Sequence, residues 1–439
     1  MKVALVTEVS TSHINGVSKT ITKLLDHLIE NNHEGIVIGP AGGSYKNKVP
    51  LIGTFGLPLF FYPELRLNFA LPHMILKLIY FKPDVIHLVD PNLLGPQILL
   101  ACKFFLPNTP IVSSYHTNIA FYAKMFGFSM LYEPIWATHR LYHGSSKYVL
   151  CPSYSTREAL AENGIPASKV LVWSRGVDNA LFSPLKRNES LRKSWFCNTV
   201  KKINTPGPVS RALSSTTSSM SMNLLSNRRS SSSSINTGEL DKMIKFEDEG
   251  VAFDNNQDKV VLLYVGRISW EKNLRVLVES FKKMNHDEYH LVIVGDGPAK
   301  QTIQSQLEST GGVTFTGYLK GEHLAEAYAS ADIFAFPSVS ETFGQVVLEA
   351  QASGLPVVGM QAEGVKEIVA DGVSGILVNP NNDENKVIHD YHNAILQISS
   401  DYKTHNSMSK QALVRSQKFT WNAAMETCIN AYKNAINQN

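Results

Sequence analysis

Short apolar runs of strand length alternate with amphipathic helical segments along two long stretches of the chain. After the first run, Val17, Ile21 and Leu24 recur at helical spacing, so the chain begins as strand, loop, helix and strand. This alternation predicts parallel sheets covered by helices, which is the α/β class. The expected strands are residues 2–7, 35–39, 85–89, 111–115, 148–151 and 170–173 in the first stretch, and 260–265, 290–294, 313–315, 333–336, 357–359 and 375–378 in the second.

The alternation is interrupted between the two stretches. Residues 198–257 are rich in serine and carry no sustained apolar periodicity, which predicts a disordered insertion. Beyond residue 382 the pattern is helical, with Ala424, Cys428 and Tyr432 on roughly one face. The predicted organisation is a doubly wound domain at 1–187, a linker and Ser-rich insertion at 188–258, a second doubly wound domain at 259–415 and a carboxyl-terminal helix at 416–439.

Composition agrees with a globular protein of more than one domain. The 439 residues are too many for one ordinary core, and 44% of them are hydrophobic and 18% charged. The net charge of +3 is too small to indicate nucleic acid as the main partner. The four cysteines lie far apart, with no spacing typical of a zinc, haem or redox site, so we expect free thiols in a reducing compartment.

The sequence does not predict a membrane-spanning segment. The amino-terminal apolar run, residues 3–6, is far shorter than the core of a signal peptide, and the long apolar stretch 55–81 is broken by prolines and charged residues. We therefore expect a cytoplasmic protein that is soluble or bound peripherally to a membrane. Residues 119–136 are rich in aromatic side chains and either pack in the core or form an apolar ligand pocket or membrane-touching face.

The strongest candidate for a functional site lies in residues 332–356. A short apolar run is followed by a polar loop that holds Glu341 and by a helix that holds Glu349 and ends before Gly354. In open α/β sheets ligands bind beyond the carboxyl ends of the strands, where a helix amino terminus favours an anion. Two carboxylates at this edge suit a ligand with hydroxyl groups on both sides of a phosphate. The alternative is a pair of ordinary surface acids near a helix start.

Four further candidate positions follow predicted strands. Arg267 and Lys272 follow the first strand of the second stretch, so two cations and two carboxylates face one cleft, as a diphosphate flanked by hydroxyls requires. Gly16 lies where a phosphate is bound in a doubly wound sheet, although a plain turn also accounts for it and the segment is not a P-loop. His116 follows the strand at 111–115, and a lone histidine is more often structural than catalytic.

With these positions combined, the sequence resembles glycosyltransferase family 4, whose members are retaining enzymes of the GT-B fold. Glu341 and Glu349 match the family's two glutamates with seven residues between them. Gly266 and Arg267, followed by residues 271–273, match its diphosphate motif. The resemblance covers both α/β stretches and leaves the Ser-rich insertion unmatched. It implies two Rossmann-like domains facing a cleft, an acceptor-side domain first and a donor domain second.

The resemblance also implies a role for each candidate residue. Glu349 would bind the ribose hydroxyls of a nucleotide-sugar donor, and Glu341 would bind the transferred sugar. Gly16 matches the second glycine of the family's first loop, whereas Asn15 departs from the first glycine. The other matches are Arg267 and Lys272 to the donor diphosphate, the backbone around Phe343 and Gly344 to sugar and phosphate, and His116 to the histidine near the reacting sugar.

Segments 115–118, 173–178 and 181–182 are most similar to the branch that holds GDP-mannose-dependent α-mannosyltransferases and sulfoquinovosyltransferases. This likeness implies retaining transfer of a hexose, with mannose favoured, to a lipid or glycan acceptor at the cytosolic face of a membrane. Arg267 and Lys272 would stabilise the leaving diphosphate, and no Asp-x-Asp pair follows a predicted strand, so we expect no catalytic metal and no other cofactor. UDP-sulfoquinovose or UDP-glucose as donor remains an alternative, and so does a non-catalytic regulatory protein that binds a nucleotide sugar.

Overall fold

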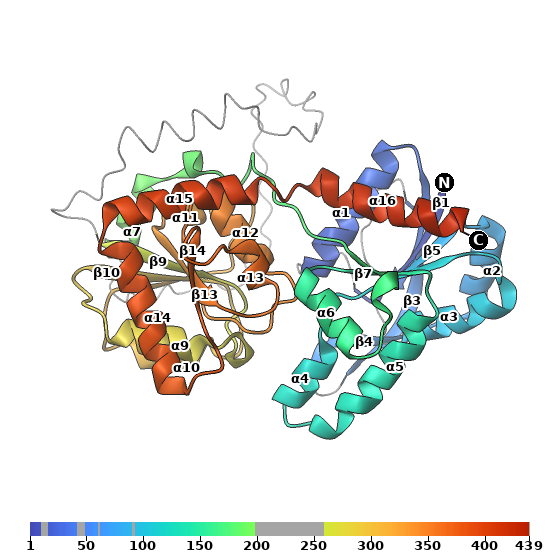
Figure 1. The fold of residues 1–439 in the computed structure, drawn as a ribbon, viewed down its shortest axis with the longest axis horizontal. Helices are drawn as coiled ribbons and strands as arrows, with labels where there is room; N and C mark the ends of the chain where they lie inside the picture. Colours follow the sequence, from blue (N-terminus) through green and yellow to red (C-terminus); the bar gives the residue numbers. More distant parts are fainter. Residues whose placement is uncertain (10–15, 42–48, 60–61, 90–92, 198–258, 439) are drawn as a thin grey trace, which may run out of the picture.

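The protein consists of two α/β domains that lie side by side, as a computed structural model shows (Figure 1). The structure describes residues 1–9, 16–41, 49–59, 62–89, 93–197 and 259–438. The predicted disordered insertion lies outside the described residues, and so does Asn15. Each domain is a sheet of mainly parallel strands with helices on its faces, which confirms the predicted fold class.

The first sheet has eight strands in the order β4-β3-β2-β1-β5-β6-β7-β8. Its strands pair in parallel except β3 and β4, which form an antiparallel hairpin at the edge. This hairpin was not predicted, because Pro58 and Pro63 interrupt the apolar pattern, and prolines are tolerated at a sheet edge. The strands are β1 Lys2–Val6, β2 Glu34–Pro40, β3 Leu51–Leu59, β4 Tyr62–Phe69, β5 Val85–Leu88, β6 Ile111–Ser114, β7 Tyr148–Cys151 and β8 Val170–Val172.

The second sheet has six strands in the order β11-β10-β9-β12-β13-β14, and all of its pairings are parallel. The strand order reverses direction at β9 and β12, and ligands of open α/β sheets bind at such a point. The loops that hold Arg267 and Glu341 follow these two neighbouring strands. The strands are β9 Val260–Val265, β10 Tyr289–Val294, β11 Val313–Gly317, β12 Ile333–Phe336, β13 Val357–Met360 and β14 Gly375–Val378.

Helices cover the two sheets. None of the helices within the described ranges is long and apolar enough to cross a membrane. Those of the first domain are α1 Gly16–Glu30, α2 Pro72–Phe81, α3 Leu94–Phe105, α4 Ile119–Met125, α5 Tyr132–Gly144 and α6 Tyr154–Glu162. The rest of the chain holds α7 Glu189–Cys197, the short helix η4 Trp270–Lys272, α9 Leu274–Lys282, α10 Lys300–Leu307, α11 Glu322–Ala329, α12 Gln345–Ala352, α13 Val365–Ile368, α14 Glu384–Ser399, α15 Tyr402–Ser416 and α16 Trp421–Asn437.

Helix α7 attaches the end of the first domain to the second domain. Arg192 on this helix is buried and lies 2.8 Å from the carboxylate of Asp332, which precedes β12. Trp195 packs in the hydrophobic core of the second domain. The first ten residues of the range 188–258, predicted as linker and insertion, therefore include an ordered helix, whereas residues 198–258 lie outside the part that the structure describes.

The last helix returns to the first domain. Figure 1 shows α16, in red, lying on the domain that holds the amino terminus. Cys428 and Tyr432 pack there in one core with residues of β1 and α1. Before α16, the backbone N–H of Val177 donates to the carbonyl of Phe419 at 3.1 Å, so two interdomain segments run side by side. The predicted apolar face of the final helix is confirmed, and it buries against the first domain.

Because these two segments pack tightly, we expect Gly176→Ala to lower the stability of the folded protein. A Cβ atom at Gly176 would collide with the backbone of Thr420 and Trp421. Overpacking of this kind lowers stability by about 1–3 kcal/mol, and denaturant unfolding should detect the loss. Gly144→Ala is the control, because nothing lies near a Cβ atom there. Equal stability of the two variants would contradict the close approach of the segments.

Candidate functional site

Glu341 and Lys272 form an ion pair in the cleft-facing loops of the second domain. Glu341 lies in the loop between β12 and α12, and Lys272 ends η4 after β9. The Lys272 Nζ atom lies 2.7 Å from Glu341 Oε1, and both side chains are largely buried. Burial alone would lower the pKa of Lys272, but the adjacent Glu341 carboxylate raises it above its usual range. The lysine is therefore a permanent cation beside the loop.

Glu349 forms a second ion pair, and this pair spans the two domains. Gly344, with a φ of +93°, allows the chain to turn into α12, on which Glu349 lies one turn from the start. Lys19 Nζ, on α1 of the first domain, lies 2.6 Å from Glu349 Oε1. The buried Tyr328 hydroxyl donates to Glu349 Oε2 at 3.4 Å. A buried carboxylate is thus held by a cation from the opposite domain.

The loop after β9 lies against the loop after β10. Its residue Arg267 is partly buried, and the Arg267 carbonyl accepts a hydrogen bond from the Tyr264 hydroxyl at 2.9 Å. A Cβ atom on Gly295, where φ is +134°, would collide with the carbonyl of Gly266, so the two loops require glycine to approach this closely. The short helix η4 follows within the loop after β9 and ends at Lys272.

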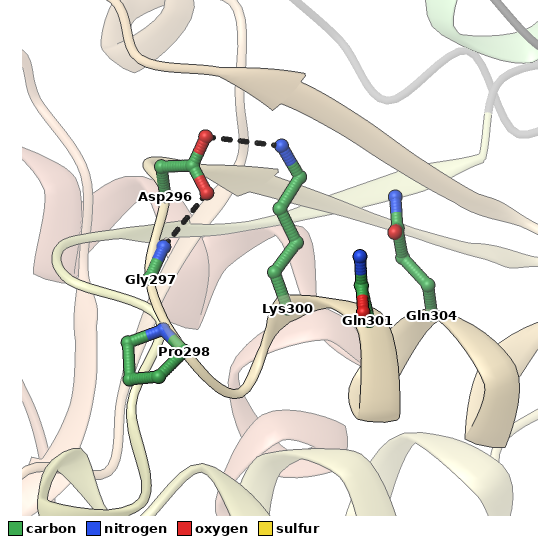
Figure 2. A pocket seen from close by; sticks show the side chains of 6 residues that line it. All are labelled: Asp296, Gly297, Pro298, Lys300, Gln301 and Gln304. Atoms are coloured by element: carbon green, nitrogen blue, oxygen red, sulfur yellow. Dashed lines mark hydrogen bonds and ion pairs between the residues drawn. The ribbon is translucent and has the colours of Figure 1, made fainter.

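A pocket of about 550 Å³ opens beside these loops, at the start of α10. Figure 2 shows the carboxylate of Asp296 between the Gly297 amide and the ammonium group of Lys300. These contacts lower the pKa of Asp296, the Gly297 hydrogen bond most strongly and Lys300 after it. The pocket has a polar lining, which consists of Asp296, Gly297, Pro298, Lys300, Gln301 and Gln304.

The ring of His116 is held by two hydrogen bonds inside the first domain. An Nη atom of Arg175 donates to His116 Nδ1 at 2.6 Å, and a guanidinium group has no acceptor, so His116 Nδ1 carries no proton. The proton therefore lies on Nε2, which donates to Ser114 Oγ at 2.9 Å. Burial, followed by the charge of Arg175, holds the pKa of His116 well below its usual range. The imidazole is neutral, and both of its nitrogens are engaged.

The backbone of His116, by contrast, faces the second domain. Its carbonyl accepts a hydrogen bond from Thr342 Oγ1 at 2.9 Å. Tyr122 on α4 donates to the Ser340 carbonyl at 3.4 Å. The loop of Glu341 is therefore held from the first domain on both sides of that residue.

Hydrogen bonds continue from His116 through the core of the first domain to the last helix. Ser114 Oγ bridges His116 to His87 Nε2, which lies 2.9 Å away. His87 Nδ1 lies 2.6 Å from the hydroxyl of Tyr432 on α16. Burial lowers the pKa of His87 to about 3, so this ring is neutral as well. The orientation of the His116 ring thus depends on residues far apart in the chain.

A further set of contacts closes the interface at α6. Glu367 on α13 accepts hydrogen bonds from the backbone N–H groups of Tyr154 and Ser155 at 2.8 and 2.5 Å. Glu363 accepts from Thr156 Oγ1 at 2.5 Å. Because the amino terminus of a helix carries a partial positive charge, carboxylates stabilise it. These bonds join the first domain to the segment that follows β13.

The structure brings most of the predicted site residues to the cleft. Lys272 and Glu341 lie in contact, and Thr342 links that loop to His116. Gly16 is exposed at the first position of α1, one turn before Lys19. Within the described residues, no cluster of three or more histidine, cysteine or acidic side chains is arranged to hold a metal ion. The ligand contacts of these residues stay predictions.

Two predicted backbone contacts have different environments. The Phe343 side chain is buried, and its ring lies 6.0 Å from that of Phe419. Because the side chain packs in the interior, a ligand contact at this residue would be made by its backbone. Gly344 directly precedes α12, whose first N–H groups have no partners within the helix. In the aromatic stretch 119–136, Trp136 is buried whereas Met130 is 81% exposed, so core packing accounts for part of the stretch only.

Sequence reasoning missed three residues that shape the site. Lys19 stands one helical turn after Gly16, a position that signals proximity to the cleft but not its partner, Glu349. Arg175 falls within the segment 173–178, which was noted only for its family likeness. For Glu367, no local signal distinguishes it from a surface acid, because its partners belong to the other domain.

Comparison with known proteins agrees with this architecture. Residues 14–181 match the family described as Glycosyltransferase Family 4, and residues 246–415 match Glycosyl transferases group 1. A GDP-mannose-dependent alpha-mannosyltransferase of Mycolicibacterium smegmatis is 30% identical over 388 residues, which are 86% of this chain and 84% of that protein. Sulfoquinovosyl transferase SQD2 of Arabidopsis thaliana is 28% identical over 432 residues, 96% of this chain and 71% of that protein.

Two solved structures share the fold. Sucrose-phosphate synthase from Thermosynechococcus elongatus superposes with a TM-score of 0.70 at 17% identity, covering 100% of both chains. Anabaena HepE in complex with UDP and glucose superposes with a TM-score of 0.62 at 17% identity, covering 98% of both chains. Two parallel-sheet domains with these neighbours define the GT-B fold. The chain belongs to glycosyltransferase family 4.

The buried histidines near the site predict a loss of stability in acid. Burial lowers the pKa of His139 from 6.5 to about 4, so between these values the unfolded chain binds a proton that the folded chain does not. The free energy of unfolding should therefore fall as the pH is lowered below 6.5, by about 1.4 kcal/mol per pH unit for this residue. His139→Phe should remove that part of the pH dependence in denaturant unfolding.

His323→Phe is the control for this measurement, because the His323 side chain is 82% exposed. Its pH dependence should match that of the unaltered protein. A His139→Phe variant that loses stability in acid as steeply as the unaltered protein would contradict a buried, neutral imidazole.

Proposed function

We propose that the protein is a retaining hexosyltransferase that moves a sugar from a nucleoside diphosphate to an acceptor hydroxyl. The observation that carries this proposal is the pairing of Lys272 with Glu341 across from Glu349 and Lys19. Cations suit a diphosphate, and carboxylates suit the hydroxyl groups on both sides of it. Glu341 would hold the transferred sugar, and Glu349 the ribose.

In the proposed reaction, the leaving diphosphate gains negative charge as its bond to the sugar breaks. Arg267, Lys272 and the N–H groups at the start of α12 would stabilise that charge, and such preorganised electrostatics contribute strongly to catalysis. Gly16 and the backbone at Phe343 and Gly344 would contact phosphate and sugar. The acceptor would attack from the face of the leaving group and give its proton to a phosphate oxygen. No catalytic metal would then be required.

His116 would act through its position in this reaction. Both nitrogens of its neutral ring are engaged within the first domain, which argues against a role as the principal base. Its carbonyl, bonded to Thr342, would keep the Glu341 loop in place while the sugar is bound. The residue therefore supports the transfer without exchanging a proton.

GDP-mannose is the donor that we favour. The relative from Mycolicibacterium smegmatis is named a GDP-mannose-dependent alpha-mannosyltransferase. The pocket at α10 lies beside the proposed diphosphate loop, and the Asp296 carboxylate in it can accept from the two adjacent N–H donors of guanine, whereas uracil offers one. UDP-sulfoquinovose remains the alternative because SQD2 is a relative of similar identity, and UDP-glucose is a further alternative.

For the acceptor, we propose a lipid or a lipid-linked glycan, met at the cytosolic face of a membrane. Phe126, Phe128 and Met130 are 61%, 57% and 81% exposed on the segment between α4 and α5. Lys124 lies exposed next to them. Apolar side chains with a neighbouring cation suit an interface with anionic lipid. Tyr122 on the same helix reaches the Glu341 loop, so this surface adjoins the proposed site.

Substitution of the paired residues tests the proposed catalysis. Lys272→Ala and Glu341→Ala should each lower kcat at least ~100-fold, because each removes a group that acts on developing charge or on the moving sugar. The control is Lys282→Ala, which removes a comparable lysine that pairs with Glu279 at 2.8 Å on the exposed side of α9. Near-normal rates in both site variants would contradict the proposal.

Donor choice and metal dependence need a separate measurement. Thermal unfolding with GDP-mannose, UDP-glucose and UDP-sulfoquinovose should show the largest stabilisation with GDP-mannose, since a ligand stabilises the fold according to its affinity. Turnover of that donor should continue in excess chelator. Stabilisation by no nucleotide sugar would favour a different function. Binding of a nucleotide sugar that is neither transferred nor slowly hydrolysed would favour a non-catalytic binding protein.

A further inference from the structure

The ion pair between Lys19 and Glu349 joins the first turns of two helices from opposite domains. Helix α1 begins at Gly16 and α12 begins at Gln345, so Lys19 and Glu349 are the fourth and fifth residues of their helices. Their side chains meet at 2.6 Å. Because side chains lean toward the amino terminus of a helix, both groups project toward the end where N–H groups are free. The two positive helix ends therefore lie close together.

The two partners differ in their surroundings. The Glu349 side chain is 6% exposed, whereas that of Lys19 is 37% exposed. A carboxylate withdrawn from water is costly unless a cation or hydrogen bonds compensate for it. Among the described residues, the other hydrogen-bond donors to this carboxylate are more distant: the Tyr328 hydroxyl at 3.4 Å and the Gln345 side-chain amide at 3.5 Å. Lys19 thus supplies the short contact of this carboxylate.

The same carboxylate is the group proposed to bind the donor ribose. Two ribose hydroxyls that use both oxygens of Glu349 compete with Lys19 Nζ, which lies 2.6 Å from Oε1. An ammonium group that leaves this ion pair needs a new anionic partner. Gly16 lies three residues before Lys19, about 4.5 Å along the helix axis, and the donor diphosphate is proposed to lie there. The lysine can therefore exchange one anion for another by a side-chain rotation.

We propose that Lys19 is a donor-responsive cation, which neutralises Glu349 in the nucleotide-free protein and binds the donor diphosphate once ribose occupies Glu349. This inference rests on the proposed function. The ring of Phe182 lies 5.6 Å below the ammonium group and provides a surface over which it can turn. A lysine suits this exchange better than an arginine because its charge is compact and its stem flexible. Lys19 thereby joins Arg267 and Lys272 from the opposite side of the cleft.

The proposed exchange predicts ligand affinities that differ from those expected for a lysine that only holds the two domains together. A nucleoside without phosphate competes with Lys19 for Glu349 but offers the lysine no new anionic partner. A nucleoside diphosphate competes for Glu349 and also provides phosphate oxygens for the ammonium group. Removing the ammonium group should therefore weaken nucleoside diphosphate binding while leaving nucleoside binding unchanged or tighter. A purely structural lysine would affect both ligands alike.

Calorimetric titration of the full chain with GDP, UDP, guanosine and uridine tests the proposal. In Lys19→Met, the ratio of the diphosphate Kd to the nucleoside Kd should rise about tenfold or more, the effect of losing one charge-assisted contact. Lys19→Gln keeps a polar group against Glu349 and should raise the ratio as well, which covers the case that the methionine variant does not fold. Lys23→Met on the same helix is the control and should leave the ratio unchanged.

Each outcome has a distinct meaning. A ratio that is unchanged in both Lys19 variants, whether or not the individual affinities fall, overturns the role of Lys19 and leaves the proposed function intact. Failure of the unaltered protein to bind GDP or UDP overturns the proposed function and this inference together. A ratio that rises equally in Lys23→Met also overturns the inference, because the effect would then reflect the charge of the helix.

Discussion

Two carboxylates withdrawn from water inside the cleft set the main physical constraint on this protein. An uncompensated carboxylate there would be strongly destabilising, so each needs a cation fixed beside it. Glu341 has Lys272 from its own domain, and Glu349 has Lys19 from the other domain. The cleft is thereby a site of paired charges even without ligand. A nucleoside diphosphate sugar, which brings anions and hydroxyl donors together, can replace these pairs without leaving a charge unmatched.

The rest of the structure places these charges. Because β9 and β12 are parallel neighbours, the loops of Arg267 and Glu341 lie at one edge of the second sheet. Glycines with positive φ allow the tight turns in these loops and before α12. The first domain contributes contacts from His116 and from the start of α6. Helix α16 returns to the first domain and holds His116 indirectly through Tyr432 and His87. Geometry at the cleft thus depends on chain segments from beginning to end.

The local sequence pattern predicts strands and the residues that directly follow them. The strands at 148–151, 260–265, 333–336 and 375–378 were predicted with the bounds that the structure has, since buried parallel strands are continuous apolar runs. Glu341 and Lys272 were predicted because each follows a strand with a recognisable spacing. Contacts between distant segments carry no such signal: Lys19 meets Glu349 across 330 positions, and Arg175 fixes the His116 ring across 59. The engaged imidazole and the cross-domain pair therefore emerged only from the fold.

The central claim is that both domains build one donor site, and hydrogen exchange with mass-spectrometric detection tests it most directly. Exchange would be followed in peptides from the start of α1 and from the start of α12 while GDP or UDP is titrated. If both domains bind the donor, both peptides should become protected together, with the same dependence on nucleotide concentration. Protection confined to the second domain, with α1 unchanged at saturation, would contradict it.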